Sequence, residues 1–189
     1  MNILSQIDKS WTLFLDRDGV INHEKKEDYV LNWSEFKFYD GVTEALKILS
    51  EIFGTIVMVT NQRGVGKGLM TIDDLNSIHT NMREEIIAAS GRLDKIYFCS
   101  STDNNCYERK PNPGMAFQAQ KDFSSIDFKK SIMIGNKLSD MQFGKNAGMY
   151  TIFVETTNPE VPSPHPLIDI RCKDLLAAAK LVEAYIIKS

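Results

Sequence analysis

Five short apolar runs recur along the chain, separated by segments with helical features, and this alternation is the strongest constraint on the fold. The runs are Trp11–Leu15, Thr55–Thr60, Lys95–Cys99, Ser131–Gly135 and Tyr150–Val154. Runs without strict alternation of apolar and polar residues are typical of strands that are covered on both faces in a parallel sheet. Their alternation with helices predicts an α/β protein with a doubly wound, Rossmann-like parallel sheet and helices on both faces.

The segments between the runs carry helix signals. Val42, Leu46 and Leu49 recur at helical spacing, and Gly54 ends that helix. A second helix is expected from Thr71 to about residue 90, because Thr71 is a good N-cap and the residue three positions later completes a capping box. Further helices are expected over three ranges, the first of them capped by Asn112: 113–122, 138–146 and 173–187.

Bulk composition narrows the class of protein. The length of 189 residues predicts a single domain, residues 1–189, and 43% hydrophobic with 25% charged residues is ordinary for a globular protein. A net charge of −3 gives no indication of a nucleic-acid surface, and the N-terminus does not resemble a signal peptide. Three cysteines fit a reducing compartment. We therefore expect a cytoplasmic protein without a nucleic-acid or membrane partner, as a monomer or weak dimer.

Polar residues directly follow the predicted strands. In an open parallel sheet, ligands bind beyond the carboxyl ends of the strands, so these side chains should converge at one edge. Four segments contribute to this convergence: Asp16 with Asp18, Thr60 with Asn61, Arg109 with Lys110, and Asn136 with Asp140. The convergence predicts a polar ligand site more strongly than any single motif does.

The first pair of carboxylates suits phosphate-ester chemistry. In an extended run, Asp16 and Asp18 share one face, and a Mg²⁺ ion between them would relieve their repulsion. Asp16 could then attack phosphorus, while Asp18 protonates the leaving alcohol and later activates water. Thr60 and Lys110 could bind the phosphoryl oxygens, and Arg109 could hold a second anionic group.

Four motifs resemble those of the haloacid dehalogenase (HAD) superfamily of phosphohydrolases, in the same order. They are Asp16-Arg-Asp-Gly-Val, Thr60-Asn, Lys110-Pro and Gly135-Asn-Lys-Leu-Ser-Asp140. Longer matches make the chain similar to the branch that contains the heptose bisphosphate and histidinol-phosphate phosphatases. The resemblance implies a HAD-like fold with a minimal cap.

The resemblance also implies a role for each matching residue. The catalytic residues would be the nucleophile Asp16, the acid/base Asp18 and the phosphate binders Thr60 and Lys110. The ligands of Mg²⁺ would be Asp16, Asp18, Asn136 and Asp140, and the substrate contacts would be Asn61, Arg63, Arg109 and Lys137. For Lys137, an ion pair with Asp16 or Asp140 is an alternative.

The implied activity is that of a Mg²⁺-dependent phosphomonoesterase acting on a small phosphorylated metabolite. By resemblance the favoured substrate is D-glycero-D-manno-heptose 1,7-bisphosphate. One alternative is a histidinol-phosphate phosphatase, and another is the phosphatase module of a nucleic-acid repair protein, which the acidic pI of about 5.7 disfavours. A non-catalytic binding protein with the same fold is a further alternative, and Asn136 is its only support.

Two departures from the family pattern affect these expectations. Asn136 stands where the family usually has an aspartate, so the site would lose one negative charge although the amide oxygen remains an acceptable metal ligand. The loop after the third run contains Cys99 and Cys106 but no histidine, so no zinc is expected there. Cys172 is expected to belong to the packing.

The remaining candidates have simpler interpretations. His23 is expected in a solvated loop, and His79 is expected to be a surface or core residue of a helix. The glycine-rich segment 63–68 lacks the spacing of an ATP-binding loop and is interpreted as a flexible loop on the substrate side. The proline-rich stretch 156–166 is expected to be a surface excursion.

Overall fold

A single sheet organises the structure. The computed structural model describes residues 3–187, and within that range six parallel strands form a sheet in the order β3-β2-β1-β4-β5-β6. The strands are β1 (Thr12–Leu15), β2 (Thr55–Asn61), β3 (Lys95–Cys99), β4 (Ser131–Gly135), β5 (Tyr150–Val154) and β6 (Ile170–Cys172). The central strand β1 pairs with β2 on one side and with β4 on the other. The predicted parallel α/β sheet is therefore confirmed, with β6 as an additional edge strand.

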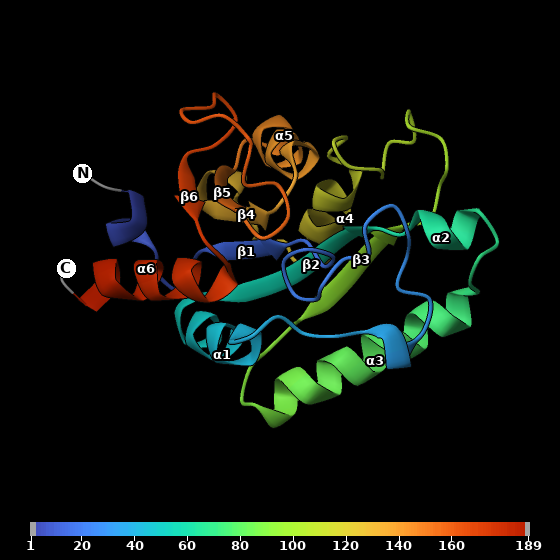
Figure 1. Cartoon of the computed structure of the whole chain (residues 1–189). Coiled ribbons are helices and arrows are strands. Elements are labelled where there is room, and N and C mark those ends of the chain that lie inside the picture. Colours follow the sequence, from blue (N-terminus) through green and yellow to red (C-terminus); the bar gives the residue numbers. More distant parts are fainter. Residues whose placement is uncertain (1–2, 188–189) are drawn as a thin grey trace.

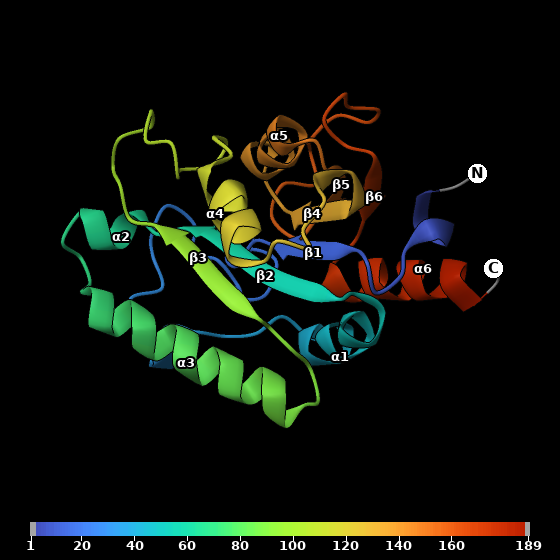
Figure 2. The same ribbon diagram turned by 180° about the vertical axis from the view of Figure 1, so that it is seen from behind.

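Helices cover both faces of this sheet. Figures 1 and 2 show α1, α3 and α6 on one face and α4 and α5 on the other. The α-helices are α1 (Val42–Ile52), α2 (Arg63–Gly66), α3 (Ile72–Ala88), α4 (Gly114–Asp122), α5 (Leu138–Ala147) and α6 (Leu175–Ile187). Short 3₁₀ turns are η1 (Ile3–Gln6), η2 (Trp33–Glu35) and η3 (Phe128–Lys130). The arrangement is the doubly wound one that the sequence predicts.

The apolar runs are continuous because each strand is buried on both sides. Leu13 and Leu15 of β1 belong to the core beneath α1, α3 and α6, whereas Phe14 belongs to the core beneath α4 and α5. Side chains along a strand alternate between its two faces, so both sets of positions must be apolar. This central position holds the end of β1 rigidly, which matters for the carboxylates that follow it.

Two local expectations were wrong, and one strand was not predicted. The cap of α4 is Pro113 instead of Asn112, whose side-chain amide donates to the carbonyl of Cys106 at 2.9 Å. The segment after β2 begins with the short helix α2 instead of a flexible loop. The strand β6 was missed because its three residues, Ile-Arg-Cys, carry too little apolar pattern.

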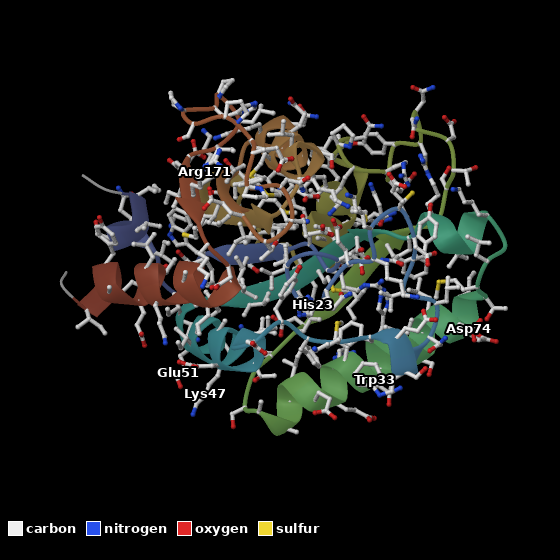
Figure 3. The ribbon with its side chains drawn as sticks, viewed as in Figure 1. His23, Trp33, Lys47, Glu51, Asp74 and Arg171 are labelled. Carbon is white, nitrogen blue, oxygen red and sulfur yellow. The ribbon has the colours of Figure 1, made fainter. Side chains whose placement is uncertain are left out.

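The proline-rich stretch follows the sequence expectation. The proline-rich stretch 156–166 runs over the surface between β5 and β6, and Figure 1 shows it extending beyond the sheet beside α5. Trp33 of η2 lies over α3 (Figure 3) and stacks on Phe36, with 4.9 Å between ring centroids. None of the helices in residues 3–187 combines the length and apolar character that crossing a membrane would require.

The start of α3 provides a stability test. Thr71 Oγ1 accepts from the amide of Asp74 at 3.0 Å, and a carboxylate oxygen of Asp74, at the beginning of α3 in Figure 3, accepts from the amide of Thr71 at 2.8 Å. Thr71→Ala removes one half of this capping box, so we expect a loss of about 1 kcal/mol in the free energy of unfolding by urea. Thr71→Ser keeps the hydroxyl and should change it little. Equal losses in both variants would contradict the capping role.

Candidate active site

The ends of three neighbouring strands bring the predicted site together. Asp16 follows β1, Thr60 lies near the end of β2, and Asn136 follows β4. The amide of Asp16 continues the ladder by donating to the carbonyl of Ile134 at 3.0 Å. Lys110 arrives from the loop after β3, and Asp140 lies in the first turn of α5. The predicted convergence of four segments at one edge of the sheet is therefore confirmed.

A buried lysine joins two of the aspartates. Lys110 Nζ lies 2.7 Å from Asp16 Oδ1 and 2.8 Å from Asp140 Oδ1, and all three side chains are almost completely excluded from solvent. Burial raises the pKa of Asp16 to about 7, the charge of Asp140 adds to this rise, and Lys110 opposes it. Burial alone would lower the pKa of Lys110, but Asp140 and Asp16 raise it above its usual value. Lys110 therefore stays charged, and the two carboxylates share one cation.

The backbone near Lys110 is held by Asn61 at the end of β2. The side-chain amide of Asn61 donates to the carbonyl of Lys110 at 3.0 Å, and its oxygen accepts from the amide of Lys110 at 3.1 Å. This reciprocal pair satisfies both polar groups of one peptide unit, so Asn61 fixes the direction of Lys110. Both the nitrogen and the oxygen of the Asn61 side chain take part in this pair. We therefore assign Asn61 mainly to positioning Lys110, and only secondarily to contacting substrate.

Asp18 has surroundings of the opposite kind. It accepts hydrogen bonds from Arg17 Nη2 at 2.8 and 3.0 Å, from Asn22 Nδ2 at 3.0 Å and from Gln62 Nε2 at 2.9 Å. Burial alone would raise the pKa of Asp18, but the charge of Arg17 and these hydrogen bonds lower it below its usual value. Gln62 Nε2 also donates to Thr60 Oγ1 at 2.9 Å, so the same amide orients the threonine hydroxyl.

The donors around Asp18 were not among the predicted site residues. Arg17 stands between the two aspartates in the sequence, and Gln62 follows the Thr60-Asn pair. The position of Arg17 in the sequence could have indicated a contact with Asp18, because a guanidinium between two aspartates either pairs with one of their carboxylates or points away from both. For Asn22 no local pattern in the sequence indicates a contact with Asp18.

Asn136 is fully buried, and its amide is only half satisfied. Its Nδ2 donates to Thr157 Oγ1 at 2.6 Å, whereas its Oδ1 has no hydrogen-bond partner within residues 3–187. The side chain packs directly on the backbone of Gly19, where a β-carbon would approach Asn136 Nδ2 to 2.0 Å. Gly19 also has a φ of +88°, so only glycine fits this contact. A buried oxygen without a donor is a suitable ligand for a hard cation.

The carboxylate of Asp140 makes more contacts within the protein than the sequence suggested. One of its oxygens contacts Lys110, and the other accepts from the backbone amide of Lys137, the N-cap residue of α5, at 3.0 Å. Both oxygens therefore have protein partners. Asp140 serves as the second anchor of Lys110 and as the cap of the helix that carries it.

Lys137 lies differently from one sequence expectation, whereas His23 lies in an exposed loop, as expected. Lys137 Nζ pairs with Glu24 at 2.7 Å, so the expected alternative, an ion pair with Asp16 or Asp140, was wrong. Burial alone would lower the pKa of Lys137, and Glu24 raises it. The ring of His23 contacts that of Tyr39, with centroids 3.9 Å apart and planes tilted by 38°, and both residues line a separate hollow. Figure 3 shows His23 at the start of the segment that crosses from β1 towards α3.

A hollow of about 350 Å³ opens over these groups. Its lining unites all four predicted catalytic residues with all four predicted substrate contacts and Asp140: Asp16, Asp18, Thr60, Lys110, Asn61, Arg63, Arg109, Lys137 and Asp140, with Tyr29, Asn104 and Ser139. A neighbouring hollow of about 310 Å³ shares Asp18 and Asn61 with it and is bounded by residues 24–30. The site is thus an open depression beneath the segment that follows β1.

Two guanidinium groups face one side of this hollow. Arg109 Nη1 donates to the carbonyl of Ser101 at 3.1 Å, and Arg63 Nη2 donates to the side chain of Asn104. Burial and the nearby charge of Arg63 lower the pKa of Arg109. Arg63 Nε is buried and has no hydrogen-bond partner within the described residues. Two neighbouring cations with a spare donor form a receptive place for an anion.

The cysteine loop brings two thiols together. Cys99 Sγ and Cys106 Sγ lie 3.8 Å apart, and Cys106 Sγ donates to Glu108 at 3.2 Å. Residues 3–187 contain no group of three or more histidine, cysteine, aspartate or glutamate side chains placed to hold a metal ion. Cys172, in contrast, is buried in the core beneath α1 and α6, as its expected packing role requires.

Comparisons with known proteins decide the family. A family model described as HAD-hydrolase-like matches residues 107–176. A D-glycero-beta-D-manno-heptose-1,7-bisphosphate 7-phosphatase of Helicobacter pylori strain J99 is 38% identical over 165 residues, which cover 86% of this chain and 91% of the relative. The chain belongs to the HAD-like phosphatases.

Another relative and a solved structure support the same family assignment. A D-glycero-alpha-D-manno-heptose-1,7-bisphosphate 7-phosphatase of Mycobacterium bovis is 38% identical over 137 residues, covering 72% of each chain. The crystal structure of a D,D-heptose 1,7-bisphosphate phosphatase from B. bronchiseptica, complexed with magnesium and phosphate, matches with a TM-score of 0.84. It is 29% identical and covers 92% of this chain and 98% of its own. The HAD-like resemblance in the sequence is thereby confirmed.

The raised pKa of Asp16 predicts how the stability of the metal-free phosphatase depends on pH. In the folded protein this pKa is about 7, above the value of about 3.9 in an unfolded chain, so the folded state binds the proton more tightly. The resulting stabilisation is complete below about pH 4 and is lost as the pH rises through 7. We expect the free energy of unfolding to fall by about 3 kcal/mol between pH 5 and pH 8 from this group.

Urea unfolding in EDTA at the two pH values measures this fall. Asp16→Asn has no proton to lose at that position and should remove the fall, while Asp73→Asn, at an exposed position in α3, should leave it in place. If wild type and Asp16→Asn lost the same free energy between pH 5 and pH 8, the assignment of the raised pKa to Asp16 would be wrong.

Proposed function

We propose that this phosphatase removes the phosphate at C7 of D-glycero-D-manno-heptose 1,7-bisphosphate, with Asp16 as nucleophile. Relatives that carry this activity in their names are 38% identical to the chain, in both the alpha and the beta anomeric classes. The relative named for the alpha anomer and the one named for the beta anomer have the same percentage identity to this chain. The proposal therefore specifies which phosphate is removed, and both anomers are compared as substrates. The open hollow over Asp16 supplies the space for a phosphorylated sugar.

The reaction proceeds in two displacements on phosphorus. Asp16 attacks the phosphoryl group, the bond from phosphorus to the sugar oxygen breaks, and that oxygen takes a proton from Asp18. A water molecule then attacks the aspartyl phosphate, Asp18 takes its proton, and inorganic phosphate leaves while the Asp16 carboxylate is restored. Lys110 and the Thr60 hydroxyl stabilise the charge on the phosphoryl oxygens during both steps.

The residues present fit a Mg²⁺ ion. Asp16, Asp18 and the unpartnered Oδ1 of Asn136 are hard oxygen donors at adjacent strand ends, and the raised pKa of Asp16 reports a carboxylate in need of positive charge. Asp140 contacts the same Lys110 Nζ as Asp16 does, and on this proposal it acts through that lysine instead of as a direct ligand. When bound, the ion supplies neutralisation of the nucleophile and of the phosphoryl oxygens, so that two anions can approach.

One observation carries the choice of a bisphosphate. Arg63 and Arg109 line the same hollow as Asp16, and Arg63 Nε lacks a partner among the described residues. A second phosphate on the substrate would pair with the two guanidinium groups and offset their mutual repulsion. Histidinol phosphate, the alternative substrate, carries an ammonium group, which two guanidinium groups would repel. A non-catalytic binding protein would not need Asp16, Asp18, Thr60 and Lys110 in one hollow.

Phosphate release with Mg²⁺ tests the proposal directly. The panel contains the alpha and beta heptose 1,7-bisphosphates, histidinol phosphate, a 3′-phosphorylated oligonucleotide and an aryl phosphate. We expect one heptose bisphosphate to have the highest kcat/KM, and Asp16→Asn to lower kcat by at least about 10³-fold because it removes the nucleophile. Asp73→Asn is the matched control on an exposed helix surface. Activity that survives Asp16→Asn would contradict the covalent mechanism, and a preference for histidinol phosphate would contradict the substrate.

The metal proposal has a separate test in Asn136→Asp. A carboxylate at this position adds a negative charge to a buried site, so the variant should bind Mg²⁺ more tightly and be less stable than wild type in EDTA. Thermal unfolding with and without Mg²⁺ measures both effects without any turnover. The shift in Tm on adding Mg²⁺ should be larger in the variant, and equal shifts would show that residue 136 does not contact the ion.

A further inference from the structure

Arg17 is an unusual neighbour for an acid/base residue because its charge lies inside the protein. It is 1% exposed and is among the largest fully buried side chains of the described residues. One edge of its guanidinium contacts both carboxylate oxygens of Asp18. Its orientation therefore determines the orientation of the Asp18 carboxylate, and any group that holds the other edge of the guanidinium acts on Asp18 as well.

That other edge is held by His79 of α3. Arg17 Nη1 lies 3.3 Å from His79 Nε2, and both atoms are buried. A guanidinium has only donors, so the imidazole nitrogen must accept, and its proton must lie on Nδ1. Burial and then the charge of Arg17 lower the pKa of His79 to about 3, which keeps the ring neutral and able to accept. The pairing has a defined polarity, from Arg17 to His79.

We propose that His79 is a positioning residue of the phosphatase: by accepting from Arg17 it fixes the guanidinium, which in turn holds Asp18 in place for proton transfer to the leaving group. The inference rests on the proposed acid/base role of Asp18. Proton transfer requires the carboxyl group within hydrogen-bond reach of the leaving oxygen, so a small rotation of its partner is enough to impair it. His79 itself does not reach the hollow that contains Asp16.

His79 connects Arg17 and Asp18 to a second groove, which lies outside the hollow over Asp16. His79 also lines a groove of about 490 Å³ between α3 and the edge strand β3, together with Thr80, Arg83 and Phe98. Its ring lies 6.1 Å from that of Phe98, centroid to centroid. The chain from this groove to the reacting group therefore consists of two contacts, His79 to Arg17 and Arg17 to Asp18.

The dependence of rate on the leaving group distinguishes this role from a purely structural one. An alkyl phosphate such as glycerol phosphate needs a proton on its leaving oxygen, whereas dinitrophenyl phosphate leaves without one. The ratio of kcat/KM for the two substrates, measured on one sample, does not depend on how much of the protein is folded. Loss of the general acid lowers this ratio, and a mere loss of active protein leaves it unchanged.

The matched pair His79→Gln and His79→Met carries the test. The two side chains have similar length and helix propensity, but only glutamine retains a strong acceptor for Arg17, because a thioether sulfur accepts weakly. We expect His79→Met to lower the alkyl-to-aryl ratio at least about tenfold, out of the 10²–10⁴ that a general acid contributes, and His79→Gln to stay within about twofold of wild type. Thr80→Ala, at an exposed residue of the same groove, should match wild type.

Other outcomes overturn the inference in distinguishable ways. An unchanged ratio in His79→Met, or an equal fall in the glutamine and methionine variants, would exclude positioning through the hydrogen bond. Asp18→Asn measured in parallel should show the largest fall in the ratio. If it shows none, the acid role of Asp18 and this inference fail together, whereas the nucleophilic role of Asp16 is judged separately by Asp16→Asn.

Discussion

The ion-pair cluster of Lys110 with Asp16 and Asp140 is the constraint on which the rest of the structure depends. A charged amine that is 4% exposed is tolerated only if anions meet it, and here they come from β1 and α5 while the lysine comes from the loop after β3. These three segments are kept together by the central position of β1 between β2 and β4. Asn61 and the cap of α5 then serve the same cluster, by fixing the backbone of Lys110 and the carboxylate of Asp140.

Two aspartates separated by one residue are given opposite properties by their neighbours. Asp16 has one cation that it shares with another carboxylate, so its pKa rises, whereas Asp18 has three donors of its own, so its pKa falls. In the metal-free protein this order is the reverse of the one that a nucleophile and a general acid need. The proposed roles therefore require that the positive charge of Mg²⁺ ionise Asp16 and that Asp18 gain its proton when substrate is bound. The single residue between the two aspartates, Arg17, contributes most to the difference because its full charge pairs with Asp18 alone.

The layers and the location of the site were predictable, because continuous apolar runs and the polar residues at their ends are local signals. The five predicted strands and the capping box of Thr71 follow from such signals. Contacts between distant segments were not predictable: the partner of Lys137 is Glu24, and the partner of Arg17 is His79, 62 positions away. The short elements α2 and β6 were missed because tertiary packing stabilises them more than their own sequence does.

The pairing of β1 with β4 has a consequence for how the active site arises during synthesis. Thr12 lies beside Ser131, so the first strand of the chain finds this neighbour only after more than half of the chain has been made. Parallel pairs between such distant segments form slowly, because a long loop must close before any contact compensates for the lost entropy. A nascent chain that ends before β4 lacks Asn136 and Asp140 and leaves one edge of β1 open. Catalytic competence is therefore gained late and in one step, and incomplete chains contain an exposed strand edge that favours aggregation.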